Sequence, residues 1–369
     1  MRGGPGVRII LTAKALLLAA VLGSLFAEFN TDEFRAAYER WPHSGAPSLA
    51  SRLAAWDAAH YLTLSQDGYE AGSHSCAFYP LWPAVIRAAT PLTLGSPLVA
   101  GLLLANGLSL AACYLFYRLA GAHLGEAVGR DSLVLLLAFP GALFLSFAYT
   151  EALFLVLTLL FFLGLERGHY RAAAVAAFLL PLTRAVGVFI LAPVAWHLYE
   201  RRRHWKNWLV VLAPLLGYAA YFGLMRIWTG NAFEGFAAQR AYPNSPSIAN
   251  IFDLPAFARA FANVSGLDGM LDGAIDRALF IVFLAMLPLV YRLNRTWFWY
   301  ALPTGLGPAM SNQFFSYRRF IVVCFPVFIA LAQLFARSRS RWLFWYYVVL
   351  LAGLQAWAVK QFMTFNWAG

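Results

Sequence analysis

The sequence predicts an all-α polytopic membrane protein with about eleven transmembrane helices. Of its 369 residues, 61% are hydrophobic and only 12% are charged, which is more apolar surface than a soluble core of this size buries. A bilayer core about 30 Å thick needs roughly 20 mostly apolar residues per helix. The chain supplies such runs repeatedly, separated by short polar segments, so we expect a single membrane domain over residues 1–369.

The first predicted span is the apolar run 9–26, which follows Arg2 and Arg8. It is too long for a signal peptide and more membrane segments follow it, so we interpret it as an uncleaved helix. The other spans cover approximately residues 97–117, 132–148, 151–165, 172–183, 184–199, 208–228, 274–291, 297–311, 320–336 and 342–362. Pro181 makes two short or kinked spans the expectation for the region 172–199.

Basic residues predict the orientation, because short cytoplasmic loops carry an excess of Lys and Arg. With the N-terminus in the cytoplasm, every closely spaced basic cluster falls on the inner side. The inner segments are 118–131, 166–171, 200–206, 292–295 and 337–341. Two long segments, about 28–92 and about 229–273, then lie on the outer side. The first is expected to hold interfacial helices. The second, with turn residues at 240–246, is expected to fold over the outer face as a lid.

Composition excludes several other classes of protein. The net charge of +11 comes from small clusters at the ends of apolar runs, which indicates membrane orientation rather than nucleic-acid binding. The three cysteines, Cys76, Cys113 and Cys324, are too scattered for a disulfide framework or a metal site. Only three of the 28 basic residues are lysines, which suggests a GC-rich bacterial genome and hence a bacterial plasma membrane.

Candidate catalytic residues lie in the first long outer segment. Asp57 belongs to a stretch in which Leu53, Trp56, His60 and Leu64 recur at helical spacing, so we expect an amphipathic helix on the outer surface. A carboxylate set against aromatic rings at the membrane boundary suits a general base, because desolvation raises its pKa. The alternative interpretation is an interfacial helix whose aspartate simply faces water.

Several motifs occur in an order that resembles the PIG-V family of mannosyltransferases. These motifs are Trp56-Asp57-Ala58-Ala59-His60-Tyr61-Leu62, Gly68-Tyr69, Ala77-Phe78-Tyr79-Pro80-Leu81-Trp82-Pro83, Ser146-Phe147-Ala148-Tyr149-Thr150-Glu151-Ala152-Leu153-Phe154, Thr183-Arg184-Ala185-Val186-Gly187, Arg319-Phe320 and Phe365-Asn366-Trp367. Members of that family are multi-span glycosyltransferases of the GT-C fold class. The resemblance implies a polyprenyl- or dolichyl-phosphate-mannose donor and a hydroxyl acceptor on a lipid-linked or surface glycan.

The resemblance also implies residue roles. Asp57 matches the acidic residue that GT-C enzymes place in the first outer loop as the base, while the pair Asp32-Glu33 is a second candidate for that role. Arg319 and Arg184 match family positions, and with Arg318 they lie at outer helix ends, where the orientation rule does not put them. We expect these arginines to bind the donor phosphate, with interfacial snorkelling as the alternative.

Other residues are assigned to sugar binding or to structure. Trp56, Tyr61, His60, Tyr79 and Trp82 are expected to contact a sugar ring or to anchor the chain at the interface. Glu151, at the start of a span, is expected to bind the sugar or to cap its helix. The acidic residues Asp268, Asp272 and Asp276 repeat every four residues and are interpreted as a solvated helix face rather than a metal site.

The predicted activity is inverting transfer of mannose, or a related hexose, at the outer membrane face. A phosphate leaving group needs no protonation, so one carboxylate suffices, and neither a cofactor nor a metal is expected. The alternatives are a lipid or solute transporter, a GT-C transferase with a different sugar donor, and a noncatalytic partner of another transferase. A transporter built from inverted repeats would show symmetry between its halves, which this sequence lacks.

Overall fold

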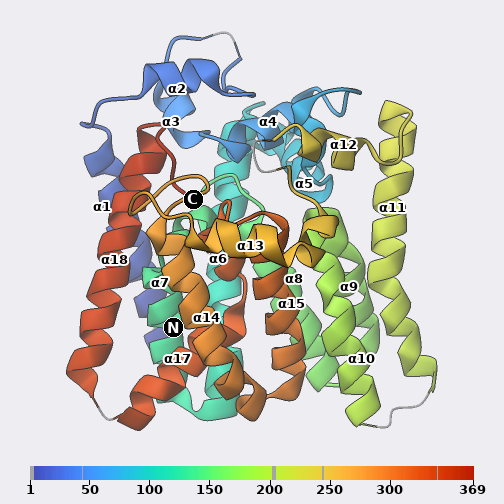
Figure 1. Cartoon of the computed structure of the whole chain (residues 1–369), viewed down its shortest axis with the longest axis vertical. Coiled ribbons are helices and arrows are strands. Elements are labelled where there is room, and N and C mark those ends of the chain that lie inside the picture. The colour runs from blue at the N-terminus through green and yellow to red at the C-terminus, as the bar shows by residue number, and fades with distance from the viewer. Residues whose placement is uncertain (1–3, 44, 202–204, 243–244, 339) are drawn as a thin grey trace.

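The computed structural model describes residues 4–43, 45–201, 205–242, 245–338 and 340–369, and these residues form helices and connecting segments without a β-sheet. The helices that make up the bundle in Figure 1 are α1 (Pro5–Ser24), α6 (Pro97–Leu124), α7 (Glu126–Ala138), α8 (Glu151–Glu166), α9 (Tyr170–Thr183), α10 (Leu191–Glu200), α11 (Leu212–Thr229), α14 (Ala274–Leu293), α15 (Arg295–Ser311), α17 (Phe325–Ser338) and α18 (Arg341–Met363). The all-helical architecture predicted from the sequence is therefore confirmed.

Shorter helices connect the bundle. Those in the two long predicted outer segments are α2 (Thr31–Ala36), α3 (Leu49–Leu53), α4 (Asp57–Gln66), η1 (His74–Ala77), α5 (Leu81–Ala89), η2 (Thr90–Thr93), α12 (Glu234–Arg240), η6 (Ile248–Phe252) and α13 (Leu254–Ala262). Those within the bundle are η3 (Pro140–Leu145), η4 (Ala185–Ile190), η5 (Trp205–Val211) and α16 (Tyr317–Ile321). In Figure 1, α2 to α5 and α12 gather at one end of the bundle, and α13 runs across it. We call this end the loop end.

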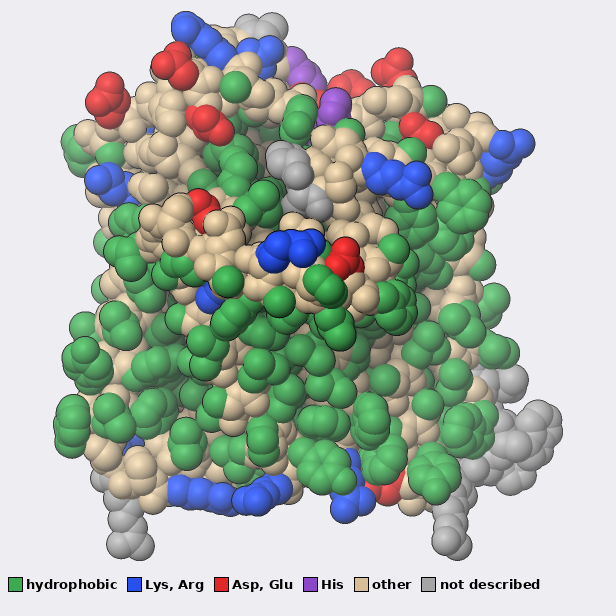
Figure 2. All heavy atoms as spheres, viewed as in Figure 1, with side chains coloured by type: hydrophobic (Ala, Val, Ile, Leu, Met, Phe, Trp, Pro, Cys, Tyr) green, Lys and Arg blue, Asp and Glu red, His purple; other side chains and the backbone are tan. Residues whose placement is uncertain are grey.

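Each predicted span contains a helix, but the helices differ in length. Within the described ranges, α1, α6, α14 and α18 are long and apolar enough to cross a membrane. Shorter apolar helices cover Tyr170–Thr183, Ala185–Glu200 and Phe325–Ser338. On the face that Figure 2 shows, a broad band of hydrophobic side chains crosses the middle of the molecule, and most charged side chains lie above or below it. A membrane protein is therefore indicated, while the total of eleven spans stays a prediction.

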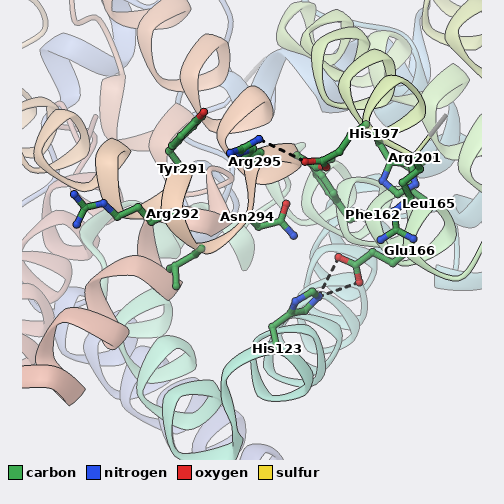
Figure 3. Close-up of a pocket in the computed structure, with 13 residues that line it drawn as sticks. His123, Phe162, Leu165, Glu166, His197, Arg201, Tyr291, Arg292, Asn294 and Arg295 are labelled. Carbon is green, nitrogen blue, oxygen red and sulfur yellow. Dashed lines mark hydrogen bonds and ion pairs between the residues drawn. The ribbon is translucent and has the colours of Figure 1, made fainter.

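The predicted inner segments meet at the end of the bundle opposite the loop end. A cavity of about 460 Å³ is lined there by His123, Glu166, Arg201 and Arg292, one from each of four predicted inner segments (Figure 3). The fifth predicted inner segment contacts the first through the ion pair of Arg341 with Asp131.

The prediction of a loop at 118–131 was wrong, because α6 and α7 run through this segment with only a break at Gly125. Arg2, Arg202, Arg203, His204 and Arg339 lie outside the described residues.

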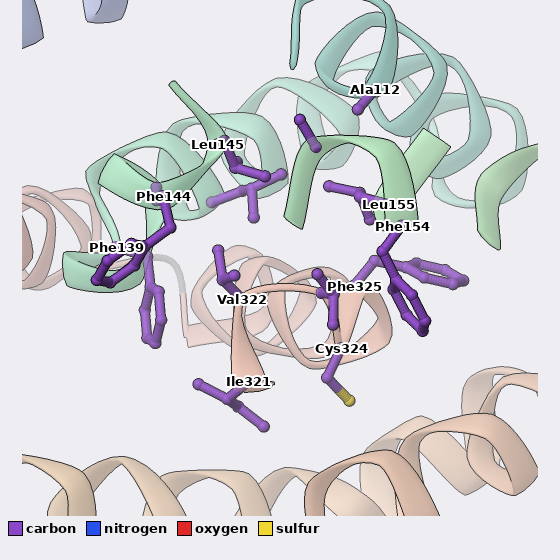
Figure 4. Packing of buried hydrophobic residues seen from close by; sticks show 14 of the residues in the cluster. Ala112, Phe139, Phe144, Leu145, Phe154, Leu155, Ile321, Val322, Cys324 and Phe325 are labelled. Atoms are coloured by element: carbon purple, nitrogen blue, oxygen red, sulfur yellow. The ribbon is translucent and has the colours of Figure 1, made fainter. Parts of the chain in front are cut away.

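Helix α8 is the central element of the bundle. It contacts α6 and α9, and it is apolar around its whole circumference, with nearly every side chain buried, as expected for a helix enclosed on all sides. Figure 4 shows its Phe154 and Leu155 packed with Val322 and Phe325, which follow α16 and begin α17. This apolar packing holds the first turn of α8 beside α16, and both elements carry charged residues at the loop end.

The predicted surface helix around Asp57 differs from the structure. Helix α3 ends at Leu53 and α4 begins at Asp57, with Trp56 between them at φ 57° and ψ −126°. Helix α4 is also largely buried rather than lying on the surface, because α5 and α6 pack against it. Asp57 therefore stands on the first turn of a helix, not on the exposed face of a longer one.

Candidate functional site

Four charged residues from distant parts of the chain converge at the loop end. Asp57 is the first residue of α4 and Glu151 the first of α8, whereas Arg184 follows the last residue of α9 and Arg319 lies in α16. Helix termini present side chains towards the boundary of the bundle, because the chain turns there. The residues are therefore brought together by the packing of three helix ends against the short helix α16.

The charged groups form a continuous chain of ion pairs. Arg319 donates from Nη1 to Asp57 Oδ2 at 2.6 Å and from Nε to Glu151 Oε1 at 2.9 Å. Arg184 Nη1 donates to the same Glu151 oxygen at 2.5 Å and to Thr150 Oγ1 at 3.3 Å. With two guanidinium groups and two carboxylates, the cluster is balanced in charge. Glu151 holds both arginines, whereas Asp57 contacts Arg319.

Aromatic rings also contact the guanidinium groups of both arginines. The Arg319 guanidinium carbon lies 4.6 Å from the ring centroid of Tyr149 and 5.0 Å from that of Phe144. The corresponding distance from Arg184 to the Phe320 ring is 4.6 Å. A guanidinium over an aromatic face is attracted by the ring quadrupole. Each arginine side chain is only 8% exposed, so these ring contacts help to stabilise two buried cations.

A cavity of about 800 Å³ opens onto this cluster. Asp57, Arg184 and Arg319 lie on its wall, together with Tyr61. Most of the remaining lining is apolar and comes from η4, α11, α12, η6, α15 and the segment around Phe320, including Val186, Val188, Phe189, Leu215, Ala219, Phe222, Phe236, Ile248, Ile251 and Phe315. The cavity is thus a large apolar chamber with three arginines, Arg184, Arg240 and Arg319, and one accessible carboxylate on its wall.

The second long segment contributes directly to this chamber. Gln239, Arg240, Tyr242, Ile248 and Ile251 line it from α12 and the residues that follow. The predicted lid segment 229–273 therefore contributes to the chamber wall, while its role as a lid stays a prediction. Two of its turn residues, Pro243 and Asn244, lie outside the described residues.

The break before Asp57 is held by the C-terminal segment. Trp56 Nε1 donates to the Asn366 carbonyl at 3.1 Å, and its ring stacks on Phe365 with centroids 4.8 Å apart. The positive φ of Trp56 is a conformation that a bulky residue rarely adopts. Contacts of this kind are what keeps such a backbone in place, so the C-terminal segment supports the position of Asp57.

The predicted sugar-binding residues separate into two groups. Tyr61 and Tyr79 line the chamber, and the Tyr79 hydroxyl lies 3.0 Å from that of Tyr218. Trp56 and His60 do not line it. His60 is buried, with Nδ1 2.8 Å from Ser75 Oγ and its ring stacked on Phe78. His60 and Tyr61 differ because neighbouring residues on α4 point in different directions.

Four other predicted positions do not line the chamber. Trp82 is fully buried and donates from Nε1 to the Ala148 carbonyl. Glu151 is also fully buried, so its carboxylate faces the arginines rather than the chamber. The alternative base Asp32 has a side chain that is 97% exposed, and neither it nor Glu33 lines the chamber.

Arg318 occupies different surroundings from its neighbour Arg319. Its fully buried guanidinium pairs with Asp276 Oδ2 at 2.9 Å and with Asp268, and it does not line the chamber. The expectation of a solvated acidic face was therefore wrong for Asp268 and Asp276, which are drawn inward by the arginine. A phosphate role for Arg318 has no support in this geometry.

Sequence reasoning missed the aromatic and hydroxyl partners of the arginines. Tyr149 and Thr150 stood out only as members of a motif, yet one lies against Arg319 and the other accepts a hydrogen bond from Arg184. Their position directly before Glu151 was the available signal. Among the described residues, no group of three or more His, Cys, Asp or Glu side chains could hold a metal ion, and metal independence stays a prediction.

Comparison with known families shows the family to which the chain belongs. The family model described as Mannosyltransferase (PIG-V) matches residues 43–242, which is more than half of the chain. The chain belongs to this family. The matched region includes Asp57, Glu151 and Arg184, whereas Arg319 lies beyond it. The membership expected from the motifs is thereby confirmed.

Two curated relatives are also named as mannosyltransferases. The GPI alpha-1,6-mannosyltransferase 2 of Rattus norvegicus is 30% identical over 218 residues, which is 55% of this chain and 43% of the rat protein. The Cricetulus griseus protein of the same name is 30% identical over 216 residues, covering 54% and 42%. The chain therefore matches less than half the length of these two mannosyltransferases.

Solved structures show a weaker likeness. The oligosaccharyltransferase of Archaeoglobus fulgidus is 14% identical, with a TM-score of 0.49, and the match covers 96% of this chain and 53% of that one. ArnT from Cupriavidus metallidurans, solved with undecaprenyl phosphate, is 16% identical, with a TM-score of 0.44 and coverage of 93% and 63%.

Proposed function

We propose that this protein is an inverting glycosyltransferase that moves mannose, or a related hexose, from a polyprenyl-phosphate carrier to a hydroxyl of a lipid-linked or surface glycan. Membership of a mannosyltransferase family supports the class of reaction. The observation that carries the proposal is the chamber of about 800 Å³, which joins long apolar walls to Arg184 and Arg319. An isoprenoid chain ending in a phosphate has the same division into apolar and anionic parts.

The two arginines suit a phosphate leaving group. Both guanidinium groups lie on the chamber wall, and their planar arrays of donors match phosphate oxygens. Negative charge grows on the phosphate as its bond to the sugar breaks. Preorganised cations at that point lower the barrier, because they need no reorganisation during the reaction. In this proposal Tyr61 and Tyr79 contact the sugar, and the segment 229–273 covers the acceptor.

Asp57 is the proposed base. Its carboxylate lies on the same wall with a side chain that is 27% exposed, so an acceptor can reach it. It takes the proton of the acceptor hydroxyl while that oxygen forms a bond to the anomeric carbon. The bond from that carbon to the phosphate oxygen breaks, and its electron pair leaves with the phosphate. Attack opposite the leaving group inverts the anomeric centre, and one carboxylate is sufficient.

The distribution of basic residues suggests how the protein is oriented in the membrane. The basic inner segments meet at the end opposite the loop end, which supports a cytoplasmic N-terminus and a site at the outer face of the membrane. The proposed membrane is a bacterial plasma membrane. In this setting the donor's lipid enters from the bilayer into the apolar part of the chamber, and its phosphate stays at the boundary beside the arginines. The whole chain acts as one membrane domain.

Transfer of radiolabelled mannose tests the proposal. The purified protein is incubated with polyprenyl-phosphate-mannose and a lipid extract of the host membrane, beside Asp57→Asn and the matched variant Asp131→Asn. Asp131 also pairs with an arginine, Arg341, but at the opposite end of the bundle. We expect transfer by wild type and Asp131→Asn, and a loss of at least about 100-fold in Asp57→Asn. Full activity of Asp57→Asn would move the base elsewhere. Absence of transfer by wild type would favour another donor, a noncatalytic role or a transporter.

A further inference from the structure

One carboxylate oxygen of the proposed base is paired with an arginine in this structure. Asp57 Oδ2 accepts a hydrogen bond from Arg319 Nη1 at 2.6 Å, and the same guanidinium faces the chamber. A carboxylate oxygen held in this way competes poorly for the proton of an acceptor hydroxyl. We infer that the donor phosphate frees Asp57 by taking over Arg319, so that the donor binds before the acceptor can react. This inference rests on the function proposed above.

Arg319 is the fixed member of the pair. Its Nε donates to Glu151 at 2.9 Å, and its guanidinium lies against the rings of Tyr149 and Phe144. Its side chain is 8% exposed. These contacts leave Arg319 little freedom to follow Asp57. A phosphate in the chamber therefore meets an arginine that stays where it is.

Asp57 is the member that can move. Its side chain is 27% exposed, and within the described residues its carboxylate has a hydrogen bond to Arg319 alone. The residue also stands at the first position of α4, directly after the break at Trp56. A rotation of its short side chain is enough to separate the two groups. The geometry thus gives an anchored cation and a carboxylate that can turn away from it.

The charges of the cluster favour exchange rather than simple addition. Asp57, Glu151, Arg184 and Arg319 together carry two positive and two negative charges, so the cluster has no spare cation. A phosphodiester adds one negative charge without adding a cation, so it competes with Asp57 for the positive charge of Arg319. Hydrogen bonds between ionised groups are about twice as strong as neutral ones, which makes the two anions direct competitors for this guanidinium.

The reaction then moves charge between the same two anions. The acceptor's proton neutralises Asp57 as the new oxygen–carbon bond forms. The electron pair of the broken carbon–oxygen bond leaves with the phosphate, which becomes a monoester with one more negative charge. The total charge of the cluster is unchanged, and Arg319 stays beside the group on which negative charge increases. An acceptor that arrives before the donor finds the base still bound to Arg319.

Binding of undecaprenyl phosphate tests this competition without needing the acceptor. Affinity is measured by titration of the full-length protein in nanodiscs, for wild type and for the isosteric variant Asp57→Asn. If Asp57 competes with phosphate for Arg319, its neutral replacement binds undecaprenyl phosphate about tenfold more tightly, as expected for removal of one charge-assisted hydrogen bond. Unchanged or weaker binding by Asp57→Asn would overturn the inference.

Three controls separate competition from other effects. Glu151→Gln changes the charge of the cluster equally but loosens the anchor of Arg319, so we expect no gain in affinity; an equal gain would show a charge effect alone and reject the inference. Undecaprenol, which lacks the phosphate, is expected to bind wild type and Asp57→Asn equally. A tenfold gain for undecaprenol would attribute the change to the cavity and also reject the inference. If wild type binds undecaprenyl phosphate no better than undecaprenol, the proposed function itself fails.

Discussion

Glu151 gives the most direct test of how the arginine pair is held. Its carboxylate is fully buried and its Oε1 accepts from Arg184 at 2.5 Å and from Arg319 at 2.9 Å. Glu151→Gln preserves the shape of the side chain and one oxygen acceptor, but it removes the negative charge. Arg184 and Arg319 would then share the single counterion Asp57 within the cluster, with a net charge of +1.

The expected cost follows from the burial of the pair. Removing one partner of a buried ion pair typically costs about 3–5 kcal/mol, because the other charge stays buried without compensation. Glutamine still accepts one hydrogen bond, which places the expected loss near the lower limit, at about 3 kcal/mol. For a chain of this size, 1 kcal/mol corresponds to roughly 2 °C or less. We therefore expect the unfolding midpoint to fall by about 5 °C.

The assay is thermal unfolding in one detergent at a fixed scan rate, since such transitions are often irreversible. Glu151→Asp keeps the charge and should lose less. The double variant Glu151→Gln/Arg184→Gln restores a balanced charge with Asp57 and Arg319, so it should recover at least half of the loss. Two results would refute the idea that Glu151 compensates the charge of both arginines. One is an unfolding midpoint of Glu151→Gln equal to that of wild type, and the other is a double variant less stable than Glu151→Gln.

Two further predictions concern buried groups outside the chamber. Arg318→Gln should lower the unfolding midpoint, because it leaves Asp276 and Asp268 buried without their shared cation. The affinity of this variant for undecaprenyl phosphate, measured by titration, should equal that of wild type. A tenfold loss of affinity would show that Arg318 takes part in phosphate binding. Burial lowers the pKa of His60 to about 3, so the folded protein excludes a proton that the unfolded chain accepts below about pH 6.5. Its contribution to stability is therefore lost as the pH falls from 6.5 towards 3, by at most about 1.4 kcal/mol per pH unit. The unfolding midpoint should fall less steeply between pH 7 and pH 5 in His60→Gln than in wild type. An equal fall in the two proteins would contradict this prediction.

The positions of the helices and of the main candidate residues could be predicted from the sequence. Long apolar runs have to be helical in a bilayer, because each backbone N–H and C=O needs a partner within its own segment. Charged residues beside such runs are costly, so Asp57, Glu151, Arg184 and Arg319 stand out in the sequence alone. These conclusions depend on local composition and spacing, which the order of residues carries directly.

The partners of those residues were decided by the tertiary structure. Arg318 and Arg319 are adjacent and chemically identical, yet one is paired with buried aspartates and the other faces the chamber, because successive helical residues point about 100° apart. Likewise, nothing local indicates that Arg319 reaches Asp57 across 262 positions of the chain. Sequence alone determined that this is a helical membrane protein with acidic and basic residues at helix ends. The packing of those ends decided which charges meet, since contacts between distant residues depend on how the helices pack against one another.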